Sequence, residues 1–297
     1  MIKNLLSENR TLIMGVLNIT PDSLSGDGLI AKDDPINHAL RLADIFIKAG
    51  ADILDIGGES TRPGANPVSA EEEIGRVIPV IEALQKHTSI PLSIDTTKAI
   101  VAEAAIKRGA KIVNDVSGLI KDPDMIKIVS KTKTHVVIMH SQTNNSVEKT
   151  DLGGRYITSR YQDVVQEVLK ELEQLTLHAI SHGVKKDKII VDVGIGFGKT
   201  VEENLELMNN LQVFNQLGYP MLLGASRKSV IGYTTHAPVD KRLGGSVAAA
   251  VLGVLKGAKI LRVHDVEETT QAVRFTEAVL KSPIHTHRNM KIQKVPE

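Results

Sequence analysis

Polar side chains able to bind a ligand follow short apolar runs at several places in the chain. The run Ile189–Asp192 ends in a carboxylate, and the glycine-rich segment Gly194–Lys199 follows directly. Asp95 and Asn114 also stand at the ends of apolar runs. Two carboxylates and an amide that converge can bind the donor–acceptor edge of a fused heterocycle, because buried carboxylates pair strongly with partners that donate several hydrogen bonds. Each of the three alone also fits a polar plug that stabilises the end of a barrel.

Cationic side chains follow two later apolar runs. Arg262 and His264 alternate in sequence, so they face the same side of an extended strand. Lys228 lies in the basic segment Ser226–Ser229. An arginine can bind phosphate oxygens through two parallel hydrogen bonds, and a histidine can donate or transfer a proton. These residues predict a phosphate site. A solvated basic loop is the alternative for Arg227 and Lys228.

Two loops near the start of the chain carry further candidates. Asn18 ends the first apolar run and offers a neutral oxygen suited to Mg²⁺ bound to a phosphate. The segment Ser60–Gly64 contains Arg62, and its proline and glycine fit a loop that closes over a substrate. The alternatives are an asparagine that caps a turn and an exposed loop charge.

The elements that must position these side chains repeat along the chain, because short apolar runs alternate with longer helical patterns. We expect strands over Leu12–Leu17, Asp52–Ile56, Pro91–Ile94, Lys111–Asn114, His135–Met139, Lys188–Asp192, Pro220–Gly224 and Lys259–Val263. We expect helices over Pro35–Ala49, Ser69–Lys86, Lys98–Arg108, Pro123–Ser130, Tyr161–Ser181, Val201–Leu217, Gly244–Lys256 and Val266–Leu280. This series predicts an α/β fold, a (β/α)8 TIM barrel. An open doubly wound sheet is the alternative.

Length and composition agree with one large domain. The chain has 297 residues, and we expect a single domain over residues 1–297, with a core from about 12 to 280 and short tails. The segment Ser141–Arg160 is the longest irregular connection. A net charge of +1 and 3% aromatic residues give no case for nucleic acid or a membrane surface as partner. The absence of cysteine excludes disulfides and thiolate metal sites and favours a cytoplasmic location.

The glycine-rich segment Gly194–Lys199 matches neither of two common nucleotide-binding motifs. A P-loop needs glycine where Val193 stands, and the dinucleotide fingerprint needs glycine where Lys199 stands. The histidines show no HExxH spacing. Triphosphate or NAD binding is therefore not predicted here.

The motifs together resemble the dihydropteroate synthase family of the folate pathway from about Leu12 to Leu280. The matching segments, in order, are Met14–Ser23, Asp55–Gly64, Ser93–Thr96, Asn114–Val116, Met139–His140, Gly194–Lys199, Ser226–Ser229 and Arg262–Asp265. The resemblance implies a (β/α)8 barrel that joins 4-aminobenzoate to 6-hydroxymethyl-7,8-dihydropterin diphosphate. It further implies Mg²⁺ and a homodimer built on the late helices.

The resemblance also implies roles for individual residues. The pterin would be bound by Asp95, Asn114, Met139, Asp192 and Lys228. Aminobenzoate would be bound by Leu24, Thr61, Arg62, Pro63, Phe197, Lys228 and Ser229. Diphosphate would be bound by Asn18, Arg62, Arg262 and His264, with Asn18 as the magnesium ligand. The catalytic residues would be Asp95, Lys228, Arg262, His264 and Arg62.

Three positions depart from the family pattern. Val193 stands where the family usually has proline, Leu24 replaces a usual phenylalanine, and residues 25–28 permute a usual Ser-Asp-Gly-Gly. Leu24 retains apolar contact but lacks a ring face, which predicts altered sulfonamide sensitivity relative to Leu24→Phe. Two alternatives remain: a methyltetrahydrofolate-dependent methyltransferase, which would not need Ser226–Lys228, and a non-catalytic pterin-binding paralogue.

Overall fold

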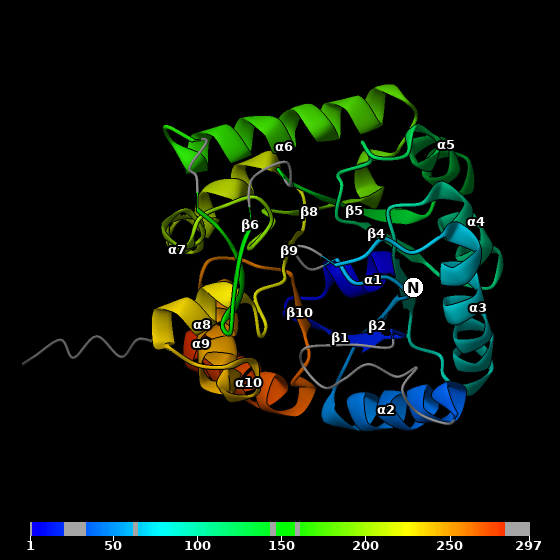
Figure 1. Cartoon of the computed structure of the whole chain (residues 1–297), viewed down its shortest axis with the longest axis horizontal. Helices are drawn as coiled ribbons and strands as arrows, with labels where there is room; N and C mark the ends of the chain where they lie inside the picture. Colours follow the sequence, from blue (N-terminus) through cyan, green and yellow to red (C-terminus); the bar gives the residue numbers. More distant parts are fainter. Residues whose placement is uncertain (1, 21–33, 62–64, 143–146, 158–160, 283–297) are drawn as a thin grey trace, which may run out of the picture.

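Eight parallel strands close into a barrel that helices surround (Figure 1). This computed structural model describes residues 2–20, 34–61, 65–142, 147–157 and 161–282. Around the barrel the strands run in the order β1-β10-β9-β8-β5-β4-β3-β2. Their bounds are β1 Leu12–Asn18, β2 Ile53–Gly57, β3 Leu92–Asp95, β4 Ile112–Asp115, β5 His135–Met139, β8 Ile189–Asp192, β9 Met221–Leu223 and β10 Ile260–Val263. The predicted (β/α)8 barrel is confirmed, and the open sheet is excluded.

The helices that cover the strands agree with the predicted ranges to within a few residues in most cases. They are α2 Pro35–Ala49, α3 Ala70–His87, α4 Ala99–Lys107, α5 Pro123–Thr132, α6 Val164–Ser181, α7 Val201–Asn209, α8 Ser229–Thr235, α9 Leu243–Leu255 and α10 Val266–Lys281. The expected helix Val201–Leu217 ends early, and a 3₁₀ helix follows it over Leu211–Leu217. The short helix α8 was not expected. Among the described residues, none of the helices is long and apolar enough to cross a bilayer.

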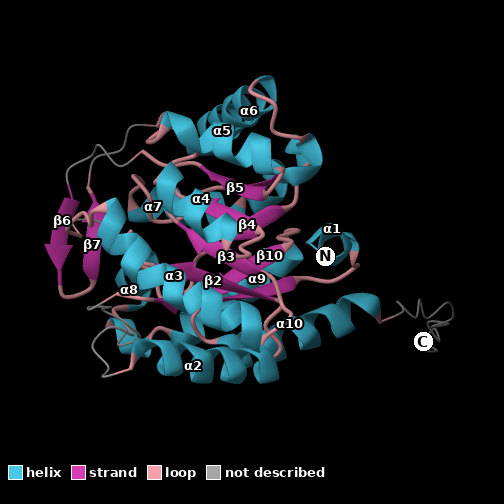
Figure 2. Cartoon of the chain, turned by 90° about the vertical axis from the view of Figure 1, so that its right-hand side faces the viewer, coloured by secondary structure: helices cyan, strands magenta, loops and turns pink. Residues whose placement is uncertain are grey.

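Two apolar clusters build the core. The larger one lies between the strands and the surrounding helices. The smaller one contains alternate strand residues such as Met14 and Ile190 and fills the barrel interior. The unpredicted helix α1 (Ile2–Ser7) packs Ile2 against this inner cluster. Figure 2 shows α1 and the pair β6–β7 at opposite ends of the barrel. Because α1 covers the end at which the strands begin, a ligand can enter at the other end, where the strands finish.

A two-stranded hairpin stands in the connection that we expected to be irregular. Its strands are β6 (Val147–Thr150) and β7 (Gly153–Tyr156), paired antiparallel. An isolated hairpin is marginally stable in water, and this one is fastened to helix α8: the Tyr233 hydroxyl donates to the Gly153 carbonyl at 2.9 Å. The stabilising contact comes from a distant segment, which is why the local pattern did not indicate the hairpin.

His135, the first residue of β5, predicts a pH-dependent stability. Its side chain is buried, and burial lowers its pKa from 6.5 to about 4. Between these values the unfolded chain binds more protons than the folded chain, so this group reduces the free energy of unfolding as pH falls from 6.5 towards 4. We expect His135→Gln to flatten this part of the pH dependence in urea unfolding, and exposed His182→Gln not to. Identical curves for wild type and His135→Gln would contradict the expectation.

Candidate active site

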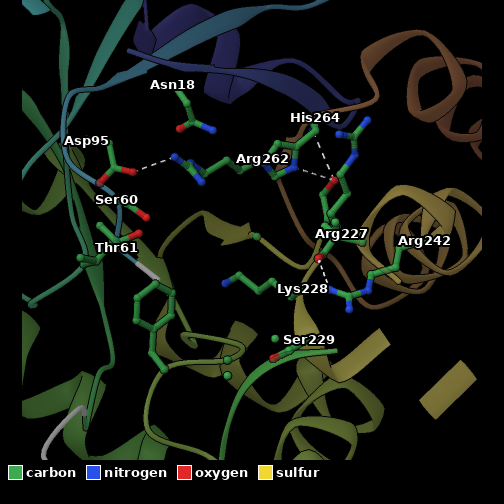
Figure 3. A pocket seen from close by; sticks show the side chains of 18 of the residues that line it. Asn18, Ser60, Thr61, Asp95, Arg227, Lys228, Ser229, Arg242, Arg262 and His264 are labelled. Carbon is green, nitrogen blue, oxygen red and sulfur yellow. Dashed lines mark hydrogen bonds and ion pairs between the residues drawn. The ribbon is translucent and has the colours of Figure 1, made fainter. Parts of the chain in front are cut away.

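A cavity of about 530 Å³ opens where the barrel strands end (Figure 3). The predicted residues that line it are Asn18, Thr61, Asp95, Asn114, Met139, Asp192, Phe197, Lys228, Ser229, Arg262 and His264. The barrel thus brings together side chains from all eight strands or the loops that follow them, because parallel strands all end at one rim. Leu24, Arg62, Pro63 and the permuted segment 25–28 lie outside the described residues.

Arg262 bridges two buried carboxylates at the floor of the cavity. Its Nε donates to Asp55 Oδ2 at 2.6 Å, and its Nη2 donates to Asp95 Oδ2 at 2.7 Å. Asn114 Nδ2 donates to the same Asp55 oxygen at 3.2 Å. Burial raises the pKa of Asp95, and Arg262 opposes that rise. Among the described residues Asp95 Oδ1 has no hydrogen-bond partner, so this oxygen can accept a hydrogen bond from a ligand.

Asp192 forms the second acidic position, and a glycine orients it. The Gly194 amide donates to Asp192 Oδ1 at 2.8 Å. Gly194 has φ +70°, and a Cβ built there would lie 1.9 Å from the His140 carbonyl oxygen, so no other residue fits. Burial raises the pKa of Asp192, and Lys228 opposes that rise. The carboxylate therefore faces the cavity with one oxygen held by main chain.

Lys228 places a cation between the acidic floor and an aromatic wall. Its Nζ donates to the Ile195 carbonyl and lies 4.7 Å from the centroid of the Phe197 ring. Burial lowers the pKa of Lys228 to about 8, and Asp192 opposes that shift. The side chain thus carries a charge at neutral pH that can contact a ligand bound against Asp192.

His264 and Arg227 lie on the same side of the cavity. His264 Nδ1 is 3.1 Å from Ser226 Oγ, and the His264 amide donates to that oxygen at 3.2 Å. Arg227 Nε donates to Asp265 Oδ2 at 3.0 Å. Arg227 is therefore paired with a carboxylate, and the alternative of a solvated basic loop does not hold for it.

The sequence did not single out three contributors to the site. Asp55 follows an apolar run as Asp95 does, so the sequence pattern marks it, but no binding role was predicted for it. Arg242 is buried and donates to the main-chain carbonyls of Ala237, Arg227 and Leu152 at 3.0, 2.9 and 2.9 Å. It thereby ties the loop before Lys228 to the hairpin turn. The hairpin itself lines the cavity through residues such as Thr150 and Gly154.

Known proteins share this architecture and sequence. A family model described as pterin binding enzyme matches residues 14–264. The dihydropteroate synthase of Clostridium beijerinckii is 45% identical over 92% of this chain and 95% of its own length. A structure of the Clostridium difficile dihydropteroate synthase solved in the presence of pteroic acid is 44% identical, with a TM-score of 0.83, over 92% of this chain and 98% of that one.

A second solved structure is similar to the same extent. The Xanthomonas albilineans dihydropteroate synthase with 4-aminobenzoic acid is 39% identical, with a TM-score of 0.84, over 93% of this chain and 95% of that one. The likeness therefore extends over nearly the full length of each protein. The chain belongs to the pterin binding enzymes, within the dihydropteroate synthase family.

Proposed function

We propose that the chain joins 4-aminobenzoate to 6-hydroxymethyl-7,8-dihydropterin diphosphate, giving 7,8-dihydropteroate and diphosphate in folate synthesis. The observation that carries this proposal is the meeting of two buried acids, Asp95 and Asp192, with two partly buried cations, Lys228 and Arg262, in one cavity. The related structures were solved in the presence of pteroic acid and with 4-aminobenzoic acid. Pteroic acid contains both halves of the proposed product, and 4-aminobenzoic acid is one of them.

The acidic floor is suited to hold the pterin. Asp95 Oδ1 lacks a partner among the described residues, and Asp192 lines the cavity with its Oδ1 held by the Gly194 amide. The N–H groups along one edge of a pterin supply the donors that these carboxylates need, and Asn114 can meet a mixed donor and acceptor position. Met139 is buried at the end of β5 and lines the cavity, where it offers apolar contact to a flat ring.

The cations suit the departure of diphosphate. As the C–O bond to the exocyclic carbon breaks, the electron pair leaves with the diphosphate, and Arg262 and His264 stabilise the developing negative charge. The carbon becomes cationic, and the carboxylates of Asp95 and Asp192 stabilise it. The aminobenzoate nitrogen then forms the new bond and loses a proton. We expect diphosphate release without aminobenzoate; a strict requirement for it would count against cleavage before attack, as would clean inversion at a labelled carbon.

Asn18 is the residue that we propose as the magnesium ligand. It ends β1 and lines the cavity with an amide oxygen, which is the class of donor that Mg²⁺ accepts. Among the described residues no cluster of three His, Asp or Glu side chains could ligate a metal ion. A single amide fits an ion that is otherwise held by phosphate oxygens and water. When bound, Mg²⁺ would neutralise negative charge on the diphosphate.

Product formation by the purified chain tests the proposed function. The chain is incubated with the dihydropterin diphosphate, 4-aminobenzoate and Mg²⁺, and dihydropteroate is measured. We expect product and diphosphate in equal amounts. Pterin binding without turnover would favour a non-catalytic paralogue, and methyl transfer from methyltetrahydrofolate would favour the methyltransferase. The cytoplasmic location remains a prediction from the sequence.

We further propose that α9 and α10, which pack together, form a homodimer interface. Leu252 and Leu255 on α9 are 43% and 54% exposed, and Phe275 and Val279 on α10 are 72% and 56% exposed. Each pair shares a helix face, since residues three or four apart are neighbours on a helix. Exposed apolar stripes of this kind mark protein interfaces.

The substitution Phe275→Glu is expected to convert the dimer to a monomer in light scattering, because it buries a charge in an apolar interface. Ile120→Glu is the matched control, since Ile120 is 65% exposed in the loop before α5. A monomeric wild type, or a Phe275→Glu variant that stays dimeric, would refute this interface.

A further inference from the structure

A second lysine, Lys199, lies behind the site and does not line its cavity. The side chain is 2% exposed. Its Nζ donates to three main-chain carbonyls, those of Gly194 at 3.0 Å, Phe197 at 3.1 Å and His140 at 3.4 Å. An ammonium group has three N–H donors and no acceptor. The three carbonyls therefore match the charged form of the side chain, as a carbonyl cage matches a small cation.

The carbonyls come from two different loops that touch through their main chains. His140 follows strand β5, whereas Gly194 and Phe197 follow strand β8. A Cβ on Gly198 would lie 1.8 Å from the Gln142 carbonyl oxygen, so the loops approach as closely as two main chains can. Carbonyl oxygens that face one another without a donor repel, and a buried unpaired carbonyl is costly. The ammonium removes that repulsion.

The residues held by Lys199 are those that hold Asp192. The Gly194 amide donates to Asp192 Oδ1 at 2.8 Å, and the His140 amide donates to the Asp192 carbonyl at 2.9 Å. Lys199 thus binds the carbonyls of the same two residues whose amides hold Asp192, the Gly194 amide at the carboxylate and the His140 amide at the main chain. The orientation of Asp192 depends on both loops keeping their places.

The same loop also supports Lys228. The Ile195 carbonyl accepts from Lys228 Nζ, and the Phe197 ring lies beneath that ammonium. Burial lowers the pKa of Lys199 to about 7, and Asp192 opposes this shift. Burial thus disfavours the ammonium form, whereas the three carbonyl acceptors favour it. The ammonium in turn supports the loop after β8, which contacts both Asp192 and Lys228.

We propose that Lys199 is a positioning residue, an internal cation that joins the loops after β5 and β8 and so fixes Asp192 and Lys228 for ligand binding. The proposal rests on the proposed function only in naming a pterin as the ligand.

The test uses Lys199→Ala and added n-propylammonium, which replaces the atoms that the substitution removes. The dissociation constant of 6-hydroxymethylpterin is measured by calorimetry. We expect it to rise at least about tenfold in Lys199→Ala, because the hydrogen bond that orients Asp192 is no longer fixed. Propylammonium should restore much of the affinity, and tetramethylammonium at equal ionic strength should not. Lys170→Ala, on the exposed face of α6, is the matched control and should bind as wild type does.

A second readout needs no pterin. Propylammonium should raise the Tm of Lys199→Ala and leave that of wild type unchanged. Wild-type affinity in Lys199→Ala, or a loss of affinity that propylammonium does not reverse, would overturn the proposal.

If Lys199→Ala does not fold, Lys199→Met takes its place, because methionine keeps the apolar stem of the side chain. Lys199→Met should then bind pterin weakly, and Lys199→Arg, which retains the charge, should bind it more tightly. Equal pterin affinity of the two variants would overturn the proposal. If wild type itself fails to bind pterin, the proposed function fails, and the Tm effect alone decides the role of Lys199.

Discussion

Replacing Lys228 with methionine is expected to lower kcat/KM for dihydropteroate formation by about 10²- to 10³-fold, the loss typical of removing one preorganised hydrogen-bond donor from an active site. Methionine keeps the unbranched stem against Phe197 and removes the ammonium group beside Asp192. The loss should appear with either substrate varied, since Lys228 lies between the acidic floor and the aromatic wall.

Two controls separate charge from packing in that experiment. Lys228→Arg retains a cation and should keep more activity than Lys228→Met. The Tm of Lys228→Met should match or exceed that of wild type, because burial lowers the pKa of Lys228 and so disfavours its charge. A kcat/KM within fivefold of wild type would remove Lys228 from the proposed mechanism.

The second large effect is expected from Arg262→Met, which should lose both stability and activity. The substitution leaves Asp55 and Asp95 buried without their shared partner. Removing one member of a buried ion pair costs about 3–5 kcal/mol, so the free energy of unfolding should fall by that amount at pH 8. Dihydropteroate formation should become undetectable, since the diphosphate loses its main cationic contact.

The pH dependence of Arg262→Met checks the cause of the instability. Burial holds the pKa of Asp95 above its usual value, and Arg262 lowers it. Without Arg262 the folded variant binds a proton at Asp95 over a wider range of pH than the unfolded chain does. Its stability should therefore increase as pH falls from 8 to 6 relative to wild type. Urea unfolding measures this, and a deficit that is constant over that range would contradict the explanation.

The fold could be predicted from the sequence because a barrel strand is buried on both faces. Such strands appear as continuous apolar runs such as Ile189–Asp192, and each is separated from the next by one helical pattern. The hairpin β6–β7 and helix α8 have no such signal. They stabilise each other through Tyr233 and Gly153, residues that are 80 positions apart.

The sequence predicted those residues of the candidate site whose location follows from their position at a strand end. Asp95, Asn114 and Asp192 stand at strand ends, so their place at the rim follows from the barrel. The sequence suggested that acids bind the heterocycle and cations bind the phosphates as separate groups. The structure instead pairs Arg262 with Asp55, 207 residues away, and with Asp95. That pairing depends on barrel closure, and no local pattern reports it.

The pairing of Arg262 with Asp55 and Asp95 limits how this arginine can bind a diphosphate. Arg262 cannot turn fully towards a diphosphate while it holds both carboxylates, unless a ligand takes over one of them. A pterin N–H donor that also competes for Asp95 Oδ2 would do so and would leave the guanidinium fixed mainly by Asp55. Pterin and diphosphate binding are therefore expected to support each other at this arginine.

The most direct measurement is a crystal structure of the chain with the dihydropterin diphosphate in its cavity. The pterin ring is expected to lie with its N–H edge on Asp95 and Asp192, and the diphosphate is expected within hydrogen-bond distance of Arg262 and His264. A pterin bound away from both carboxylates, or phosphates bound away from both cations, would contradict the division of binding roles on which the proposed reaction depends.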